Sequence, residues 1–271
     1  MRFSPAKYDT LIVSRAANWL TIELNRPKTR NALSNEMVDD LILVLGQTAR
    51  DSSLRGVTFQ GRGGVFCAGG DLKGFKSDLQ SDQAIGEVKA ASIKAGLLFE
   101  RIATLPQVVL MLVDGAAMAG GLGMVCAGDI VAVTAKAKFA LTEVTLGIPP
   151  AQIAPFVVAR LGLPRAKRLM LTAARFDGAE AMEIGLADYV VADAAGFEQV
   201  EAEVQAAVRR AAPGANAITK NIALATQFLP PNKLRDLAAE GFAKAITGSE
   251  GREGIAAFLE KRKPNWALLD D

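Results

Sequence analysis

Hydrophobic and polar positions alternate with a period of two near the start of the chain. Leu11 to Val13 and Trp19 to Leu24 alternate as strands do, and residues 16–18 form the turn between them. The period then becomes helical: Ser34 can cap a helix that runs to about Arg50. Its apolar face comprises Met37, Leu41, Val44 and Leu45. The pattern therefore predicts a hairpin followed by an amphipathic helix.

Strands and helices continue to alternate as far as about residue 192. Further strands are predicted at 57–60, 107–113, 130–134 and 189–191, with a short apolar segment at 139–141. Helices are predicted at 81–104, 151–161, 164–173, 178–185, 196–211, 214–228, 231–247 and 249–261. This alternation predicts an α/β fold with a mostly parallel sheet. We therefore expect a core over residues 1–195 and a helical region over 196–271.

Composition and charge narrow the class of protein. The 271 residues suffice for one sizeable core, and 50% hydrophobic with 22% charged residues is typical of globular proteins. The net charge of +2 and the lack of a long basic block argue against a nucleic-acid partner. No stretch has the length of a membrane span or the pattern of a signal peptide. Cys67 and Cys126 have apolar neighbours, which suits reduced thiols in a cytoplasmic protein.

The chain contains no histidine, which restricts its chemistry. Ser-His-Asp and Cys-His arrangements are excluded, and so are metals held by histidine. We expect no metal site. Catalysis, if present, must use carboxylates, backbone amides, lysine, tyrosine or cysteine.

Two glycine-rich segments are candidates for backbone hydrogen-bond donors. The stretch 113–130 contains Gly120 and Gly121 between two predicted strands, and an N–H at the start of a helix stabilises negative charge. The loop 61–70 offers the N–H of Ala68 or a neighbour. Two such donors converging on one oxygen would form an oxyanion hole. The alternatives are a tight turn before a core helix and an ordinary loop.

Glu143 is the candidate acid. Its neighbours are almost all apolar, and a carboxyl in such surroundings has its pKa raised by desolvation, which suits proton transfer near neutral pH. The alternative is a glutamate exposed at the turn before residues 147–149.

Together these segments resemble the enoyl-CoA hydratase/isomerase (crotonase) superfamily over most of the chain. The resemblance rests on Asn25-Arg26-Pro27, Asn31-Ala32-Leu33, FCAGGDL at 66–72, Gly128-Asp129-Ile130, FALTEVTLGIPP at 139–150, Ala179-Glu180-Ala181, Gly185-Leu186-Ala187-Asp188, Glu250-Gly251 and Phe258-Leu259. It implies a crotonase-like spiral of ββα units with a helical C-terminal trimerisation region. It also implies a homotrimer, or a hexamer built as a dimer of trimers.

The resemblance further implies an acyl-CoA substrate whose thioester oxygen lies between the N–H groups of Ala68 and Gly120. Coenzyme A enters as part of the substrate, and no cofactor is bound permanently. We expect coenzyme A to be contacted by residues that match the family's contacts and by candidates on the C-terminal helices. These residues are Arg26, Lys28, Ala32, Ala68, Asp71, Leu72, Phe242 and Lys261.

One departure from the family pattern affects the predicted reaction. The best-known hydratases of the family use two glutamates, and this chain has Gly123 at one position and Glu143 at the other. The run LTEVTLGIPPAQIAPFVVARLG is similar to methylglutaconyl-CoA and isohexenylglutaconyl-CoA hydratases. The resemblance thus implies hydration of a branched, 3-substituted 2-enoyl-CoA, with Glu143 as acid and base and water held by backbone around Gly123.

Other functions remain open at this stage. The same scaffold supports a double-bond isomerase, which a dry site without a polar group near Gly123 would favour. A non-catalytic CoA-binding or RNA-binding protein is the third alternative, against which the near-neutral charge and Glu143 both argue. A glutaconyl substrate carries a distal carboxylate, for which Lys89, Lys94 and Arg101 are candidate partners.

Overall fold

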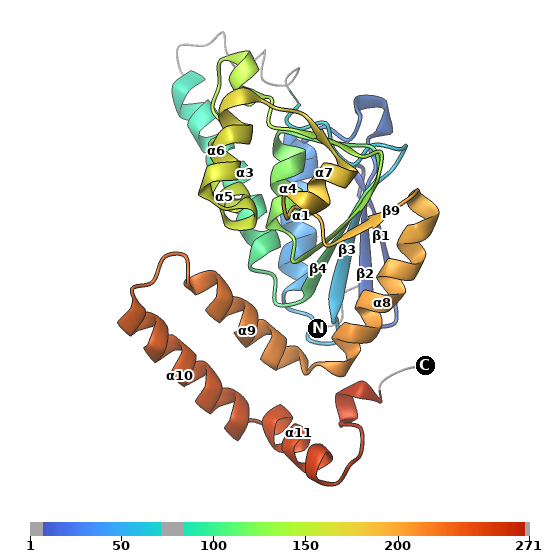
Figure 1. Cartoon of the computed structure of the whole chain (residues 1–271), viewed down its shortest axis with the longest axis vertical. Coiled ribbons are helices and arrows are strands. Elements are labelled where there is room, and N and C mark those ends of the chain that lie inside the picture. The colour runs from blue at the N-terminus through green and yellow to red at the C-terminus, as the bar shows by residue number, and fades with distance from the viewer. Residues whose placement is uncertain (1–7, 72–83, 269–271) are drawn as a thin grey trace.

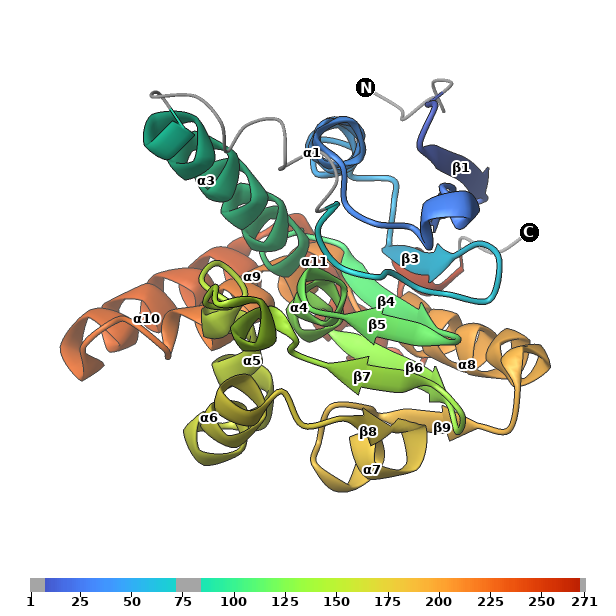
Figure 2. The ribbon, with the colours of Figure 1, turned by 90° about the horizontal axis from the view of Figure 1, so that it is seen from above.

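Two sheets form the centre of the molecule. The computed structural model describes residues 8–71 and 84–268. A six-stranded sheet has the order β1-β2-β3-β4-β6-β9, and a three-stranded sheet has the order β5-β7-β8. The first comprises β1 (Leu11–Ala16), β2 (Trp19–Leu24), β3 (Gly56–Gly61), β4 (Val108–Val113), β6 (Ile130–Thr134) and β9 (Tyr189–Val191). The second comprises β5 (Ala116–Met118), β7 (Lys138–Ala140) and β8 (Phe176–Asp177). Figure 2 shows β5 and β7 side by side beside α4.

The α/β class is confirmed, and the large sheet is mostly parallel as expected. β1 and β2 pair as an antiparallel hairpin, and every later neighbour in the large sheet is parallel. The helices of the core are α1 (Asn35–Thr48), α3 (Ala84–Ala103), α4 (Gly120–Ala127), α5 (Ala154–Leu161), α6 (Leu163–Thr172) and α7 (Gly178–Glu183). Ser34 caps α1 as predicted, because its side chain accepts the N–H of Met37 at 3.2 Å.

The two faces of the large sheet are covered by different helices. Successive residues of β4 point to opposite faces, so Val109 and Met111 join the main core while Leu110 and Leu112 face α8 (Phe197–Arg210). Trp19 packs on the α8 side, where its Nε1–H donates to Thr58 Oγ1 at 2.8 Å. Figure 1 shows α8 against the sheet. Thus the first helix of the predicted region 196–271 completes the core, and the division at residue 195 stays a prediction.

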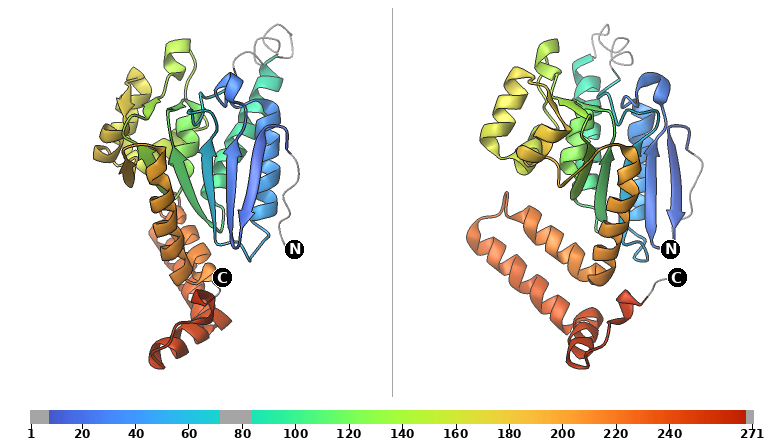
Figure 3. Two further views of the ribbon diagram at one scale, coloured as in Figure 1. Left: turned by 90° about the vertical axis from the view of Figure 1, so that its right-hand side faces the viewer. Right: turned by 45° about the vertical axis from the view of Figure 1, so that its right-hand side comes forward.

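The remaining helices extend away from the sheets (Figure 3). They are α9 (Pro213–Ala225), α10 (Pro231–Thr247) and α11 (Ser249–Leu259). Large apolar side chains on and beside them are exposed: Phe228 73%, Phe242 67%, Phe258 82% and Leu259 73%. Among the described residues, no helix is both long and apolar enough to cross a membrane.

Two strands were not predicted from the pattern. β5 and β8 have three and two residues, and neither is long enough to display an alternation. The apolar segment at 139–141 contributes to β7, which pairs in parallel with β5 and antiparallel with β8. The small sheet therefore depends on pairing between segments that are separate in the sequence.

Candidate active site

Three parallel extended segments end at one edge and bring the two glycine-rich segments close to Glu143. Cys67 forms a parallel bridge with Ala117 of β5, and β5 pairs with β7 so that Met118 lies opposite Ala140. Because parallel segments end on the same side, the residues that follow them lie together. Those residues are Gly70, Gly120 and Glu143. The fold therefore unites the elements that the sequence offered separately.

The glycine-rich loop presents the N–H of Gly70, and the prediction for Ala68 is wrong. The N–H of Ala68 donates to the carbonyl of Arg30 at 3.0 Å, so it is not available to a ligand. Leu33 pairs with this loop, donating its N–H to Gly69 O at 2.8 Å and accepting the N–H of Asp71 at 3.0 Å. The N–H of Gly70 therefore points away from Leu33, and no described residue accepts it.

Gly120 provides the second N–H group. It is the first residue of α4, where an N–H has no partner within the helix, and no described residue outside the helix accepts it. Its carbon is close to the loop, since a Cβ built on Gly120 would lie 3.9 Å from the Gly70 nitrogen. Ala119, before it, has a φ of 50° and donates its N–H to Ala140 O at 2.8 Å. This bond joins the start of α4 to β7.

Glycine at position 69 permits this close approach. Its φ is +95°, which L side chains rarely adopt, and a Cβ there would lie 2.9 Å from Ala119 Cβ. Its N–H is accepted by Cys67 Sγ at 3.4 Å. The loop and the start of α4 thus approach through small residues, which leaves their N–H groups accessible.

One of the two carboxyl oxygens of Glu143 has no hydrogen-bond partner among the described residues. It begins the short 3₁₀ helix η2 (Glu143–Leu146), the side chain is half-buried, and its Oε2 is buried with no hydrogen bond to any described residue. Desolvation raises the pKa of this carboxyl, and a hydrogen bond from its own backbone opposes the shift. A buried carboxyl oxygen without a donor is suited to accept a proton from a ligand.

Gly123 does not offer backbone for water binding, contrary to the prediction. It lies one helical turn after Gly120 and is buried, and its N–H donates to Ala119 O at 3.0 Å. Ile153 covers its carbon: a Cβ on Gly123 would lie 2.2 Å from Ile153 Cγ2. An apolar side chain therefore occupies the place next to Gly123.

Several residues predicted to contact coenzyme A meet around Arg26. Its Nη1 donates to Ala32 O at 2.7 Å, and its Nη2 lies 3.1 Å from Asp71 Oδ2. These bonds join the segment after β2 to the loop that carries Gly70. Lys28, in η1 (Pro27–Thr29), has an exposed side chain. Leu72, which follows Asp71 and was also predicted to contact coenzyme A, lies outside the described residues.

The C-terminal candidates are not brought to this edge within one chain. Phe242 lies on α10 and Lys261 follows α11, and these helices extend from the opposite end of the core in Figure 1. Of the candidates for a distal carboxylate, Lys94 pairs with Asp39 at 2.5 Å and Arg101 donates to Ile42 O at 3.0 Å. Lys89 is exposed on α3.

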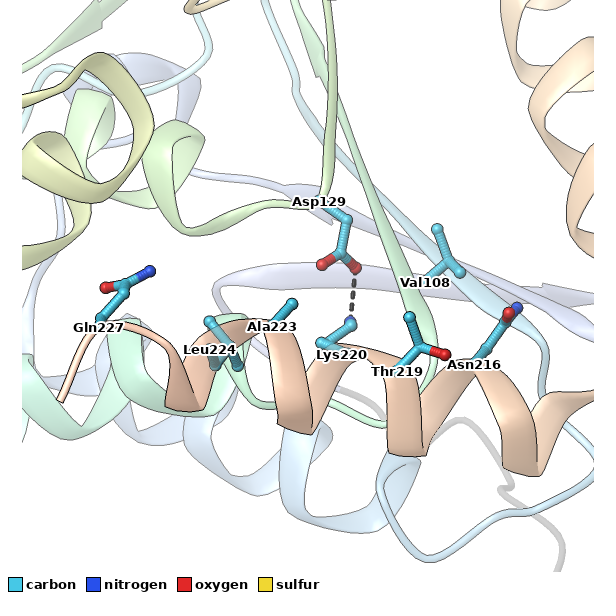
Figure 4. A pocket seen from close by; sticks show the side chains of 8 residues that line it. All are labelled: Val108, Asp129, Asn216, Thr219, Lys220, Ala223, Leu224 and Gln227. Atoms are coloured by element: carbon cyan, nitrogen blue, oxygen red, sulfur yellow. Dashed lines mark hydrogen bonds and ion pairs between the residues drawn. The ribbon is translucent and has the colours of Figure 1, made fainter. Parts of the chain in front are cut away.

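A second polar cluster, missed by the sequence reasoning, lies between α9 and the core. Lys220 Nζ donates to Asp129 Oδ2 at 2.5 Å and to the carbonyls of Leu105 and Gln107 at 2.7 Å each. A cavity of about 330 Å³ adjoins the pair, lined also by Val108, Asn216, Thr219, Ala223, Leu224 and Gln227 (Figure 4). Burial lowers the pKa of Lys220 and raises that of Asp129, while their mutual attraction opposes both shifts.

Comparisons with known proteins agree with this arrangement. Residues 14–268 match the family model described as Enoyl-CoA hydratase/isomerase. A putative enoyl-CoA hydratase of Thermus thermophilus is 34% identical over 248 residues, which cover 90% of this chain and 95% of that protein. The solved structure of Pseudomonas aeruginosa AtuE has a TM-score of 0.91 and 45% identity, with 96% of this chain and 100% of that chain covered.

A crystal structure of an enoyl-CoA hydratase/isomerase from Marinobacter aquaeolei has a TM-score of 0.89 at 37% identity, covering 96% of this chain and 99% of that chain. The match to the family model spans nearly all of the sequence, and it includes each of the three segments that meet at Gly70, Gly120 and Glu143. The chain belongs to the enoyl-CoA hydratase/isomerase family and is an enzyme of the crotonase fold.

Proposed function

We propose that the protein hydrates a branched, 3-substituted 2-enoyl-CoA, of the methylglutaconyl-CoA type, with Glu143 as the only acid and base. The observation that carries the proposal is the buried Oε2 of Glu143, which lies at the edge that holds the N–H groups of Gly70 and Gly120; none of the three has a hydrogen-bond partner among the described residues. Family membership supports an acyl-CoA substrate. The sequence similarity in 141–162 supports the branched acyl group, which stays a proposal.

In this mechanism the thioester oxygen accepts hydrogen bonds from the N–H groups of Gly70 and Gly120. The carboxylate of Glu143 takes a proton from water as the water oxygen bonds to the β-carbon. The electrons of the double bond move to form an enolate, whose negative oxygen the two donors stabilise. Glu143 then delivers its proton to the α-carbon, which completes addition of one water molecule and restores the carboxylate.

Isomerisation of a double bond is the second candidate, and one observation favours it. Ile153 covers Gly123, so an apolar group lies where the two-glutamate hydratases carry an acid. In an isomerase, Glu143 would remove a proton from one carbon and return it to another, with no water taking part. Both reactions use the same donors and the same carboxyl.

Absorbance of the conjugated enoyl-thioester distinguishes the two reactions. With 3-methylglutaconyl-CoA, a hydratase removes the absorbance band and forms a 3-hydroxyacyl-CoA that mass spectrometry detects at the mass of one added water. With a 3-enoyl-CoA, an isomerase makes the band grow at constant mass. Band growth without hydration of the first substrate would replace the proposed hydratase by an isomerase.

Gly70→Pro tests the donor assigned to the loop. Proline has no N–H, and the N–H of Gly70 is not used in pairing with Leu33, so the pairing need not be lost. Removing one oxyanion donor is expected to lower kcat by about 10²–10³-fold. Gly70→Ala, which keeps the N–H, is the matched control and is expected to retain most activity. Equal losses in both variants would show that the change of backbone, and not the donor, matters.

We also propose that the protein assembles as a trimer or as a dimer of trimers. The exposed side chains of Phe242 and Phe258 on the C-terminal helices, and of Phe228 in the turn after α9, support this proposal, because large apolar patches on a surface mark interaction sites. Assembly would bring Phe242 and Lys261 of one copy toward another copy, as the family's coenzyme A contacts require. Sedimentation equilibrium at micromolar concentration measures the assembly directly.

A further inference from the structure

We propose that Ile153 is a specificity-determining residue that limits this site to one carboxyl group. Its side chain fills the space that an acidic side chain at position 123 would need. The inference rests on the proposed function, because it concerns how many groups transfer protons at the site. According to this inference, the site uses a single glutamate because Ile153, the residue that precedes α5, packs against Gly123 of α4.

The contact allows no side chain at position 123. A Cβ built on Gly123 would lie 2.2 Å from Ile153 Cγ2 and 2.7 Å from Ile153 Cβ. Rotation about the side-chain bonds of Ile153 moves Cγ2 but leaves Cβ in place, so no rotamer relieves the overlap. Either the two helices separate or position 123 remains glycine.

The backbone of Ile153 is held on several sides, so it does not shift freely. Its carbonyl accepts the N–H groups of Phe156 and Val157 at 3.1 and 3.0 Å, and the side chain is 3% exposed. Gln152 Nε2 donates to Ser92 Oγ of α3 at 3.1 Å, and the ring of Phe156 lies 6.0 Å from that of Phe99. These contacts anchor the start of α5 on α3.

The side chain of Ile153 lies where it can affect the reaction. Gly120 and Gly123 are three residues apart on α4 and share one face of the helix. A carboxyl added at position 123 would therefore lie on the same helix face as Gly120, one turn from the N-terminal end of α4 where the N–H of Gly120 is presented. With Ile153 in place, position 123 has no room for a carboxyl, and proton transfer depends on Glu143.

A double-mutant cycle tests the packing step without reference to activity. Alanine is a better helix former than glycine, so Gly123→Ala would raise Tm if position 123 had space. With Ile153 in place it is expected to lower Tm by roughly 5–10 °C, as overpacking does. Ile153→Gly removes both clashing atoms at a helix N-cap position, which tolerates glycine. The double variant Gly123→Ala with Ile153→Gly is expected to lose less than the sum of the single losses.

Activity of the variant Gly123→Glu with Ile153→Gly tests the consequence. We expect hydration of an unsubstituted 2-enoyl-CoA such as crotonyl-CoA to rise roughly 10-fold or more over Ile153→Gly alone. We also expect a second ionisation in the pH profile of kcat/KM.

The two readouts separate failure of this inference from failure of the proposed function. Additive Tm effects, or a higher Tm in Gly123→Ala, would overturn the role of Ile153. The role of Ile153 would also be overturned if the wild-type enzyme hydrates 3-methylglutaconyl-CoA but Gly123→Glu with Ile153→Gly hydrates crotonyl-CoA no faster than Ile153→Gly alone. If the wild-type enzyme hydrates neither 3-methylglutaconyl-CoA nor crotonyl-CoA, the proposed function fails. The double-mutant cycle of Tm values alone then decides whether Ile153 excludes a side chain at position 123.

Discussion

Glu143→Gln is expected to lower kcat by about 10²–10⁴-fold, the usual contribution of a general acid or base. Glutamine has nearly the same shape and keeps the packing of η2, but it neither accepts the proton from water nor returns one to carbon. KM for the thioester is expected to change little, because the coenzyme A contacts and both N–H donors remain. Glu183→Gln, at an exposed position on α7, is the matched control and is expected to keep full activity.

The pH dependence gives this prediction its second readout. Desolvation raises the pKa of Glu143 above the ordinary 4.5, and the mechanism needs the ionised form in the free enzyme. As the pH is lowered, the wild-type kcat/KM is therefore expected to fall, and the midpoint of this fall is expected at a higher pH than for an enzyme with an exposed catalytic glutamate. The residual activity of Glu143→Gln is expected not to show this fall at acidic pH. A variant with activity within tenfold of wild type would contradict the role of Glu143.

The same pKa shift predicts the stability of the variant. A carboxyl whose pKa is raised in the folded state binds protons more tightly there, so folding loses stability as pH rises from the unfolded-state pKa through the folded-state one. Above that window the cost of burying the ionised carboxylate is fully present. Glutamine removes this cost, so the Tm of Glu143→Gln at neutral pH is expected to equal or exceed that of wild type.

Elements with several periods of pattern could be predicted from the sequence. The cap at Ser34, the hairpin β1–β2, the parallel large sheet and the C-terminal helices all follow local rules. The short strands β5 and β8 do not, because they exist only through pairing with β7. Local chemistry also indicated Glu143 correctly as a carboxyl in apolar surroundings with a raised pKa.

The choice between Ala68 and Gly70 as donor depends on contacts distant in sequence. Each loop residue carries an N–H, and the one left free is set by where the others donate. Arg30 and Leu33, more than 30 residues earlier, take the N–H groups of Ala68 and Asp71. Ile153 over Gly123 is equally non-local. Lys220 on α9 resembled any surface lysine, and its role depends on carbonyls before β4.

Lys220→Met is expected to lower the free energy of unfolding by about 3 kcal/mol, the lower end of the range for breaking a buried ion pair. The Lys220 side chain is 13% exposed and that of Asp129 is 26% exposed, so the pair is mostly shielded from water. All three N–H donors of the ammonium are used, by Asp129 Oδ2 and by the carbonyls of Leu105 and Gln107. Methionine keeps the length of the side chain and supplies none of them.

The loss is attributable to the charge left behind, and this can be tested. Without Lys220, the carboxylate of Asp129 keeps the N–H of Val109 at 2.7 Å as its hydrogen-bond donor among the described residues. Asparagine at 129 still accepts that N–H and carries no charge, so Lys220→Met with Asp129→Asn is expected to lose less than the sum of the two single losses. Urea unfolding followed by circular dichroism measures each value, and Lys244→Met, exposed on α10, is the matched control. If Lys220→Met proves as stable as this control, the ion pair makes no net contribution to stability, and apolar contacts hold α9 on the core; the partly buried pair then serves only to provide hydrogen bonds for the carbonyls that precede β4.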